Sequence, residues 1–277
     1  PPRSTPLYSS AASDVYKRQV LMALGTTYGA YMSESTGGSI ASLVVFGALS
    51  DRAKFEEAHT RLVTVANQFL ADNEDVRGHA RIRTWKHGET TLHSITFPGL
   101  PIPMEVTYSL VDNWIVAGLT PQSALTAARQ IKGTGDKGLA SNAGFASVFP
   151  GVNGKGEMPT SLTFLDTPRL MRDGYQYVSM MGSAVSNAMR SSRDESREPG
   201  MIVPTYAELK AGAKPYVSFG YWKGEDYVME THADRSMLVN LSGFMGAAAP
   251  FLPILGVMAA AAGEQAEQQM QEMEDMM

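Results

Sequence analysis

The chain contains no cysteine. This absence excludes disulfide bridges, zinc–thiolate sites and cysteine nucleophiles, but it does not choose a cellular compartment. The chain also has no basic cluster. Its 23 Lys and Arg and 28 Asp and Glu give a net charge of −5. Because proteins bind phosphate backbones with concentrated Lys and Arg, we expect no nucleic-acid partner.

The common catalytic motifs are also absent. The sequence has no Gly-x-Gly-x-x-Gly or Walker loop, no Gly-x-Ser-x-Gly elbow and no His-Glu-x-x-His pair. "GTGDKG" at Gly133–Gly138 looks like a phosphate loop, but it lacks the Lys-Ser/Thr pair that opens the following helix. We interpret it as a surface loop. We therefore predict no catalytic residue, no cofactor and no metal, and expect that the protein is not an enzyme.

The N-terminal stretch "PPRSTPLYSSAASDVYKRQ" (residues 1–19) is rich in Pro, Ser and Ala and has no apolar periodicity. It resembles a translated sequencing adapter, and we interpret it as a non-native artefact that is unstructured and makes no sheet contacts. An ordinary mobile N-terminus would have the same composition. In the artefact interpretation, the native start and any targeting signal would be missing.

The rest of the chain has the composition of a globular protein, with 44% hydrophobic and 18% charged residues. Residues 20–150 form the first predicted unit. Strand formers fill residues 20–32 and 39–49, and Ser50 or Asp51 caps a helix that runs to about residue 71. Its apolar stripe consists of Phe55, Ala58, Leu62, Val65 and Phe69. Four further strands and a helix capped by Thr120 follow.

The third of these four strands, "MEVTYSL", alternates cleanly between apolar and polar residues. We predict that Met104, Val106, Tyr108 and Leu110 face a core, and that Glu105, Thr107 and Ser109 face water. The helix after Thr120 has Pro121 at its first position. Its inner stripe consists of Ala124, Leu125, Ala128 and Ile131.

A second unit is predicted over residues 151–241. It repeats the order strand, long helix and hairpin, and its hairpin carries "YWKGED" where the first unit carries "TWKHGET". We interpret this as an internal repeat. The predicted fold class is α+β, with antiparallel sheets and long amphipathic helices packed on one face.

The tail, residues 242–277, is apolar and then acidic and rich in Met and Gln. Its segment Gly243–Ala262 has no charge over 20 residues, near the length that spans a bilayer, but it contains two prolines. We expect a packed or loosely ordered helix from about Pro250. Membrane attachment through Gly243–Ala262 is the alternative.

Glu230, His232 and Asp234 in "ETHAD" form the sharpest candidate site. In a strand they project to one side, as a metal-ligand or acid/base set would. A solvated sheet face gives the same alternation, and on that interpretation we predict that they bind no structural metal. We interpret His59, His79, His87 and His93 as surface or boundary residues. Trp85, Trp114 and Trp222 are interpreted as anchors of sheet–helix packing, with an aromatic binding surface as the alternative.

Three stretches together resemble an uncharacterised bacterial family, the domain of unknown function thirty-three fifty-two. They are "DNWIVAGLTPQSALTAARQIKG" (residues 112–133), "LASNAGFASVFPG" (139–151) and "SLTFLDTPRLM" (161–171). The resemblance implies an extracytoplasmic or cell-envelope protein without defined catalytic residues. The functional hypothesis is a non-catalytic module with protein or envelope contacts. A metal-assisted hydrolase built on Glu230, His232 and Asp234 is the alternative.

Overall fold

The computed structural model describes residues 15, 18–36, 38, 40–72, 81–96, 105–134, 138–148, 159–189, 203–252 and 256. The chain forms two compact units, Pro1–Lys137 and Gly138–Met277. Both contain antiparallel sheets and helices, which confirms the α+β class. The division lies before the predicted boundary at residue 150, because Phe145 of helix α4 (Ala143–Val148) packs edge-on against Phe164 of the second unit.

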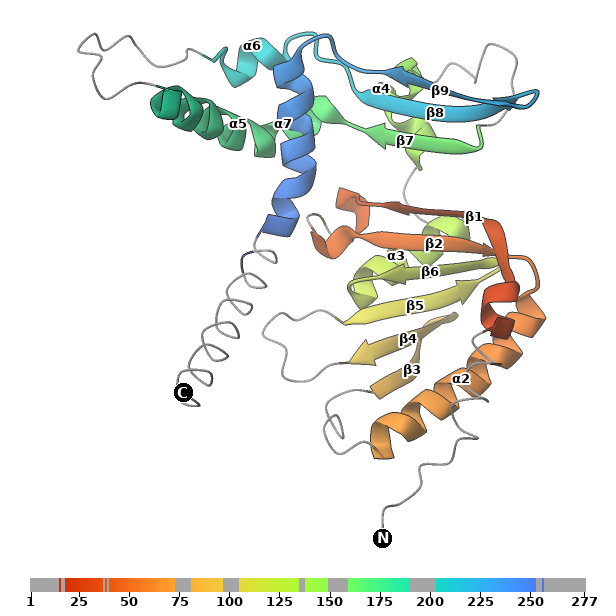
Figure 1. The fold of residues 1–277 in the computed structure, drawn as a ribbon. Helices are drawn as coiled ribbons and strands as arrows, with labels where there is room; N and C mark the ends of the chain where they lie inside the picture. The colour runs from red at the N-terminus through yellow and green to blue at the C-terminus, as the bar shows by residue number, and fades with distance from the viewer. Residues whose placement is uncertain are drawn as a thin grey trace, which may run out of the picture. The chain divides into compact units, whose positions relative to one another are not determined.

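The first unit is built on a six-stranded antiparallel sheet with the order β1-β2-β6-β5-β4-β3 (Figure 1). The strands are β1 (Leu24–Tyr31), β2 (Val44–Leu49), β3 (Arg81–His87), β4 (Thr90–Thr96), β5 (Val106–Val111) and β6 (Trp114–Gly118). Short 3-10 turns, η1 (Glu34–Thr36) and η2 (Ile40–Ser42), connect β1 to β2. We predicted a strand from residue 20, but residues 18–22 are helical, and Val20 packs against Ala23, Leu49 and Phe55.

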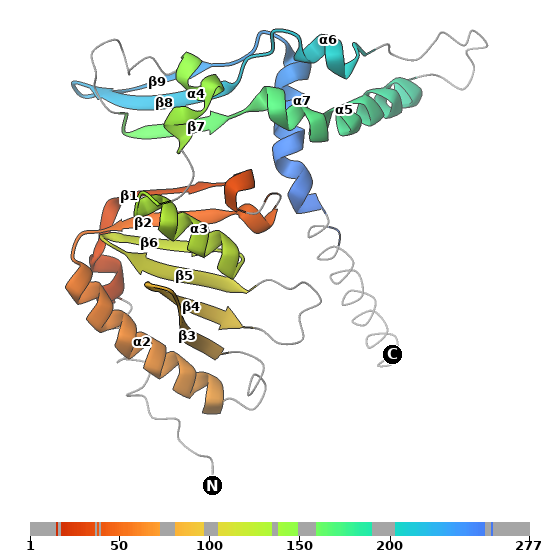
Figure 2. The ribbon, with the colours of Figure 1, turned by 180° about the vertical axis from the view of Figure 1, so that it is seen from behind.

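The two faces of this sheet are covered by different helices. Phe55 of α2 (Arg52–Asp72) packs with Leu110 and Ile115 on one face. Ala127 and Ala128 of α3 (Pro121–Ile131) pack with Val111 and Val116 on the other. Figure 2 shows α3 over strands β6 and β5.

The α3 side of the sheet corrects one expectation. Thr107 and Ser109, predicted to face water, are fully buried at 0% exposure. Their hydroxyls find partners within the sheet: Ser109 Oγ donates to the carbonyl of Thr91 over 2.7 Å, and Thr107 Oγ1 donates to the carbonyl of Glu105. Small, hydrogen-bonded side chains let an alanine-rich helix lie close, so polar alternation here marks a second buried face.

Helix α3 begins where the sequence predicted. Thr120 Oγ1 accepts a hydrogen bond from the backbone N–H of Ser123, Ser123 Oγ accepts one from Thr120 N–H, and Pro121 occupies the first turn. A side chain at Gly118 would overlap Ser123. The glycine at the end of β6 therefore allows the capped first turn to sit against the strand.

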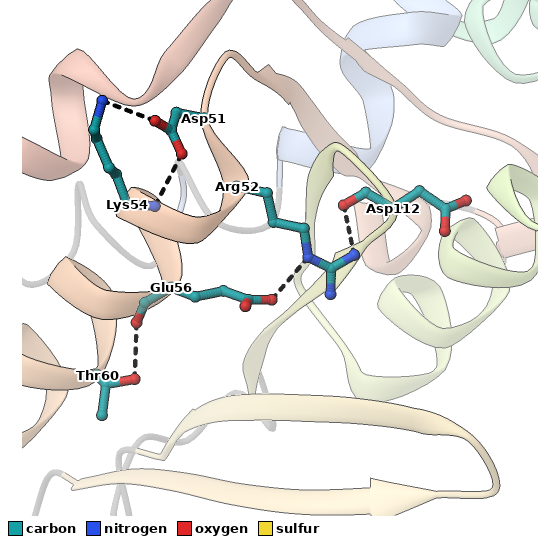
Figure 3. A network of polar contacts seen from close by, with 6 residues as sticks. All are labelled: Asp51, Arg52, Lys54, Glu56, Thr60 and Asp112. Atoms are coloured by element: carbon teal, nitrogen blue, oxygen red, sulfur yellow. Dashed lines mark hydrogen bonds and ion pairs between the residues drawn. The ribbon is translucent and has the colours of Figure 1, made fainter.

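Helix α2 is anchored at its N-terminus by the polar network of Figure 3. Asp51 Oδ1 caps the helix by accepting from Lys54 N–H at 3.0 Å. Arg52 pairs with Glu56 at 2.8 Å and donates to the carbonyl of Asp112 in the β5–β6 turn, also at 2.8 Å. These contacts fix the start of α2 against the sheet.

The far end of α2 departs from the predicted stripe. Phe69 is 64% exposed, while Phe55, Ala58 and His59 are the buried residues of the helix. Near this end, the Asn67 amide bonds to both the N–H and the carbonyl of Ile82 in edge strand β3. Asn67 thus occupies a free strand edge, where the helix offers less apolar cover.

The second unit has a three-stranded antiparallel sheet in the order β7-β8-β9. Its strands are β7 (Ser161–Leu165), β8 (Tyr216–Lys223) and β9 (Asp226–His232), and its helices are α4, α5 (Thr167–Met189), α6 (Tyr206–Lys210) and α7 (Met237–Ala248). A 3-10 turn, η5 (Ala249–Phe251), follows α7, and η3 (Leu139–Ser141) precedes α4. Val217 and Phe219 form its sheet core with Phe164 and Tyr221.

Helices α5 and α7 cross in close contact over glycines. A methyl group at Gly174 would overlap the carbonyl oxygen of Ser242, and one at Gly246 would overlap the carbonyl oxygen of Leu170. A methyl at Gly243 would come within 2.6 Å of Thr167. The segment from residue 242, predicted as the start of a tail, therefore belongs in part to the second unit's helical packing.

The rest of the predicted tail lies mainly outside the described residues. Helix α7 begins at Met237 and ends before Pro250, so a helix precedes the one that we expected from Pro250. Within the described residues, no helix combines the length and apolar character that crossing a membrane requires. Most of the predicted artefact, residues 1–19, also lies outside the described part of the chain, and its described residues 15, 18 and 19 are helical where we predicted no structure.

The order strand, long helix and hairpin occurs in both units. Both hairpins turn through Gly-Glu, with Gly88 at φ +57° and Gly224 at φ +67°. The strand pairing differs, however, because β7 pairs directly with β8, whereas β6 and β5 separate β2 from the β3–β4 hairpin. His87 adds one residue before the first turn, so Trp85 and Trp222 lie at different distances from their turns. The repeat remains a hypothesis.

Candidate functional site

The predicted Glu230–His232–Asp234 set begins on edge strand β9. Glu230 Oε1 and His232 Nε2 lie 2.9 Å apart, with side-chain exposures of 42% and 49%. The His232 ring stacks on Phe219, whose centroid is 5.7 Å away. The carboxylate therefore orients a half-exposed imidazole on the face of the sheet that carries Val217 and Phe219.

Asp234 has a different role. It follows the end of β9, and its two carboxylate oxygens accept backbone hydrogen bonds from Lys214 at 2.9 Å and from Ser236 at 2.7 Å. Ser236 is the N-cap of α7, so Asp234 holds the connection between strand and helix. Across the described residues, no group of three or more His, Asp and Glu side chains has the geometry of a metal site.

A second cluster, which the sequence analysis did not identify, lies between α2 and the first sheet. We call His59, His93 and Tyr108 the imidazole cluster. His59 Nε2 and the Tyr108 hydroxyl are 2.7 Å apart, and the two imidazole centroids are 4.8 Å apart. The His93 ring stacks on Tyr108 at 5.0 Å, and its Nδ1 lies 3.0 Å from Thr84 Oγ1.

Burial controls the protonation of this cluster. It lowers the pKa of His59 to about 4, with a further lowering from His93 and a smaller opposing effect from Glu56. It also lowers the pKa of His93 and raises that of Tyr108 to about 12. The three side chains are therefore neutral at pH 7.

The imidazole cluster corrects the interpretation of His59 as a surface or boundary residue, because it is 9% exposed. The signal was present in the sequence. His59 follows Phe55 by four residues and so lies on the same helical face, while Tyr108 was already assigned to the apolar side of its strand. Of the other histidines, His93 is half-buried, His87 is exposed and His79 lies outside the described residues.

On the face of the sheet opposite the imidazole cluster, strands β3, β4 and β5 carry a series of hydrogen-bonded polar side chains. Thr107 uses its one hydroxyl proton on the Glu105 carbonyl, so Ser94 Oγ donates to Thr107 over 2.9 Å. Ser94 in turn accepts from Trp85 Nε1–H at 3.0 Å. Trp85 also borders an open hollow with Arg83, Thr84 and Glu105. The indole is thus fixed by a buried network while 37% of the residue is exposed.

The β8–β9 hairpin presents three large apolar side chains on one face. Trp222 and Tyr227 are direct cross-strand partners with ring centroids 5.2 Å apart, and Met229 follows Tyr227 on the same side. We call these three residues the aromatic strip. They are 60%, 44% and 65% exposed, respectively. Trp222 therefore makes a cross-strand contact rather than the predicted helix packing.

Local structure fixes the centre of this strip. The Tyr227 hydroxyl lies 2.7 Å from Ser161 Oγ on β7, so its ring extends across β8. A methyl group at Gly220 would overlap that hydroxyl, and only glycine leaves room for the ring. The strip is therefore presented in a defined orientation.

Comparison of the chain with family models, with curated proteins and with solved structures finds no match. The resemblance to the domain of unknown function thirty-three fifty-two accordingly remains a hypothesis, and the local geometry is the basis for the functional argument.

Proposed function

We propose that this protein is a non-catalytic binding module that contacts another protein through the aromatic strip. The observation that carries this proposal is the exposure of Trp222, Tyr227 and Met229 side by side on one face of a hairpin. Large apolar side chains gathered on a surface are typical of interaction sites, and Trp and Tyr are enriched among the residues that dominate binding energy.

The fixed geometry of the strip supports this function. The Tyr227 ring is fixed by the hydrogen bond between its hydroxyl and Ser161 and by its fit over Gly220. Less side-chain entropy is therefore lost when a partner binds. Glu230 lies on the other side of the same strand, where it pairs with His232, whose ring stacks on the buried Phe219. The exposed aromatic strip and the core residues Val217 and Phe219 therefore lie on opposite sides of the sheet.

The location that we propose is extracytoplasmic or at the cell envelope, on the basis of the family resemblance alone, which makes an envelope protein the expected partner. The hydrolase alternative has weaker support, because Asp234 caps the β9–α7 connection and leaves Glu230 and His232 as a pair. Membrane attachment through Gly243–Ala262 also has weaker support, because Gly243 and Gly246 lie in the close contact between α5 and α7.

Site-specific photo-crosslinking tests the proposal. A photoreactive amino acid is placed at Met229, and the full chain is exposed to a bacterial envelope fraction. We expect an adduct with a defined protein that disappears when Trp222→Ser is added. The matched control places the same photoreactive group at Glu230, on the opposite side of β9, and should give no such adduct.

Two results would count against this function. Equal labelling from positions 229 and 230 would show that the aromatic strip has no special role. Labelling of lipid alone would favour membrane attachment over a protein partner.

A further inference from the structure

The attachment of α2 to the first sheet depends on a histidine in an unusual position. Among the residues of α2, only Phe55, Ala58 and His59 are buried. His59 is the one of these three that can take up a proton, and its ring stacks on Phe55 at 6.0 Å while it bonds to Tyr108 on β5. The contact between helix and sheet is therefore centred on a titratable side chain.

The surroundings offer little compensation for a positive charge at His59. Strands β3, β4 and β5 contain no Asp or Glu, and the titratable groups they place on this face are Lys86, His93 and Tyr108. From α2 itself, Glu56 faces His59, but its carboxylate is already paired with Arg52. A second imidazole 4.8 Å away would itself be disfavoured beside an imidazolium.

We propose that the imidazole cluster makes α2 an acid-released helix, which separates from the sheet as the pH falls from 7 to 5. Neutral His59 and His93 stabilise the packed state, and protonation favours the separated state, in which both rings regain water. The Asp51 cap and the contact of Arg52 with Asp112 hold the N-terminus of α2 without histidine. Separation therefore begins in the part of the helix beyond Phe55.

The size of the effect follows from linkage. Burial lowers the pKa of His59 from its ordinary value to about 4, so the separated helix binds more protons than the packed one below about pH 6.5. Stability of the packed state falls as the pH falls through this window, and the loss is complete below about pH 4. At pH 5 the opening equilibrium should rise by about 30-fold relative to pH 7.5 from His59 alone.

Hydrogen exchange of the full chain, measured by mass spectrometry and corrected for intrinsic exchange rates, tests this inference. We expect peptides from residues 56–72 to lose about 30-fold of their protection between pH 7.5 and pH 5, while peptides from β8 and β9 keep theirs. In His59→Gln, whose amide can still bond to Tyr108 but takes up no proton, this pH dependence should be largely lost.

Two further variants keep the test decisive. His232→Gln, at an exposed imidazole of the other unit, should retain the wild-type pH dependence. Should His59→Gln fail to fold, His93→Gln should show a reduced pH dependence, because it removes one of the two buried imidazoles and, beside the larger effect of burial, the charge interaction that also lowers the pKa of His59. Unchanged protection of α2 at pH 5 in the wild type, or an undiminished pH dependence in both cluster variants, would overturn the proposal.

Discussion

Replacement of Gly174 by alanine tests the helical packing of the second unit. In an isolated helix this change is favourable by about 1 kcal/mol, since glycine is the poorer helix former. In the folded protein, the new methyl group would overlap the carbonyl oxygen of Ser242 and the amide nitrogen of Gly246. Both obstacles are backbone atoms, so no side-chain rotation relieves the overlap and α7 must shift as a whole.

The magnitude decides between the two effects. Overpacking a close contact costs about 1–3 kcal/mol, and a backbone obstacle places Gly174 at the upper end of that range. After the gain in helix propensity is subtracted, we expect Gly174→Ala to lower the free energy of unfolding by about 2 kcal/mol. Urea unfolding followed by far-UV circular dichroism measures this difference.

The exposed Ser183 of the same helix supplies the control, because Ser183→Ala should change stability by less than about 0.5 kcal/mol. Combining Gly174→Ala with Gly246→Ala sharpens the test. Once one methyl has displaced α7, the second should cost less than it does alone. A stabilised Gly174→Ala variant, or strict additivity of the two changes, would refute close packing of these helices.

Two other predictions concern single polar groups of the same unit. Ser242 is fully buried, and within the described structure its hydroxyl has no hydrogen-bond partner. Ser242→Ala should therefore leave the free energy of unfolding in urea unchanged or raise it by about 1 kcal/mol. A decrease of more than about 1 kcal/mol would show that the hydroxyl does have a partner. Asp234→Ala should lower the free energy of unfolding by about 1–2 kcal/mol in the same measurement, because two backbone N–H groups lose their acceptor. It should also increase hydrogen exchange at the start of α7. The control Glu230→Ala should leave stability nearly unchanged.

Local sequence signals predicted most of the secondary structure. The Thr120 cap with Pro121, the Asp51 cap and the two Gly-Glu turns each depend on a few neighbouring residues, and each occurs at the predicted place. Such features are specified by short-range hydrogen bonds and by allowed backbone angles, so a linear pattern is sufficient to find them.

Features that depend on distant segments were harder to predict. Thr107 and Ser109 follow the pattern of a solvated face, yet an alanine-rich face of α3 covers them. The pattern records polarity, but whether a hydroxyl meets water or a strand carbonyl depends on which helix packs over it. The pairing of β2 with β6 likewise brings together strands that are far apart in sequence, and no local pattern specifies it.

The candidate sites show the same limit in chemical terms. The spacing of Glu230, His232 and Asp234 predicted one shared face, but the strand ends at His232 and Asp234 bonds to the backbone that begins α7. His59, His93 and Tyr108 are far apart in sequence, and antiparallel pairing of β4 with β5 beneath α2 brings them together. Closeness in sequence therefore led us to include Asp234 in the first site, and the large sequence separation of His59, His93 and Tyr108 kept the second site from being predicted. In both cases, the hydrogen-bond partner of each side chain determined whether that residue belongs to the site.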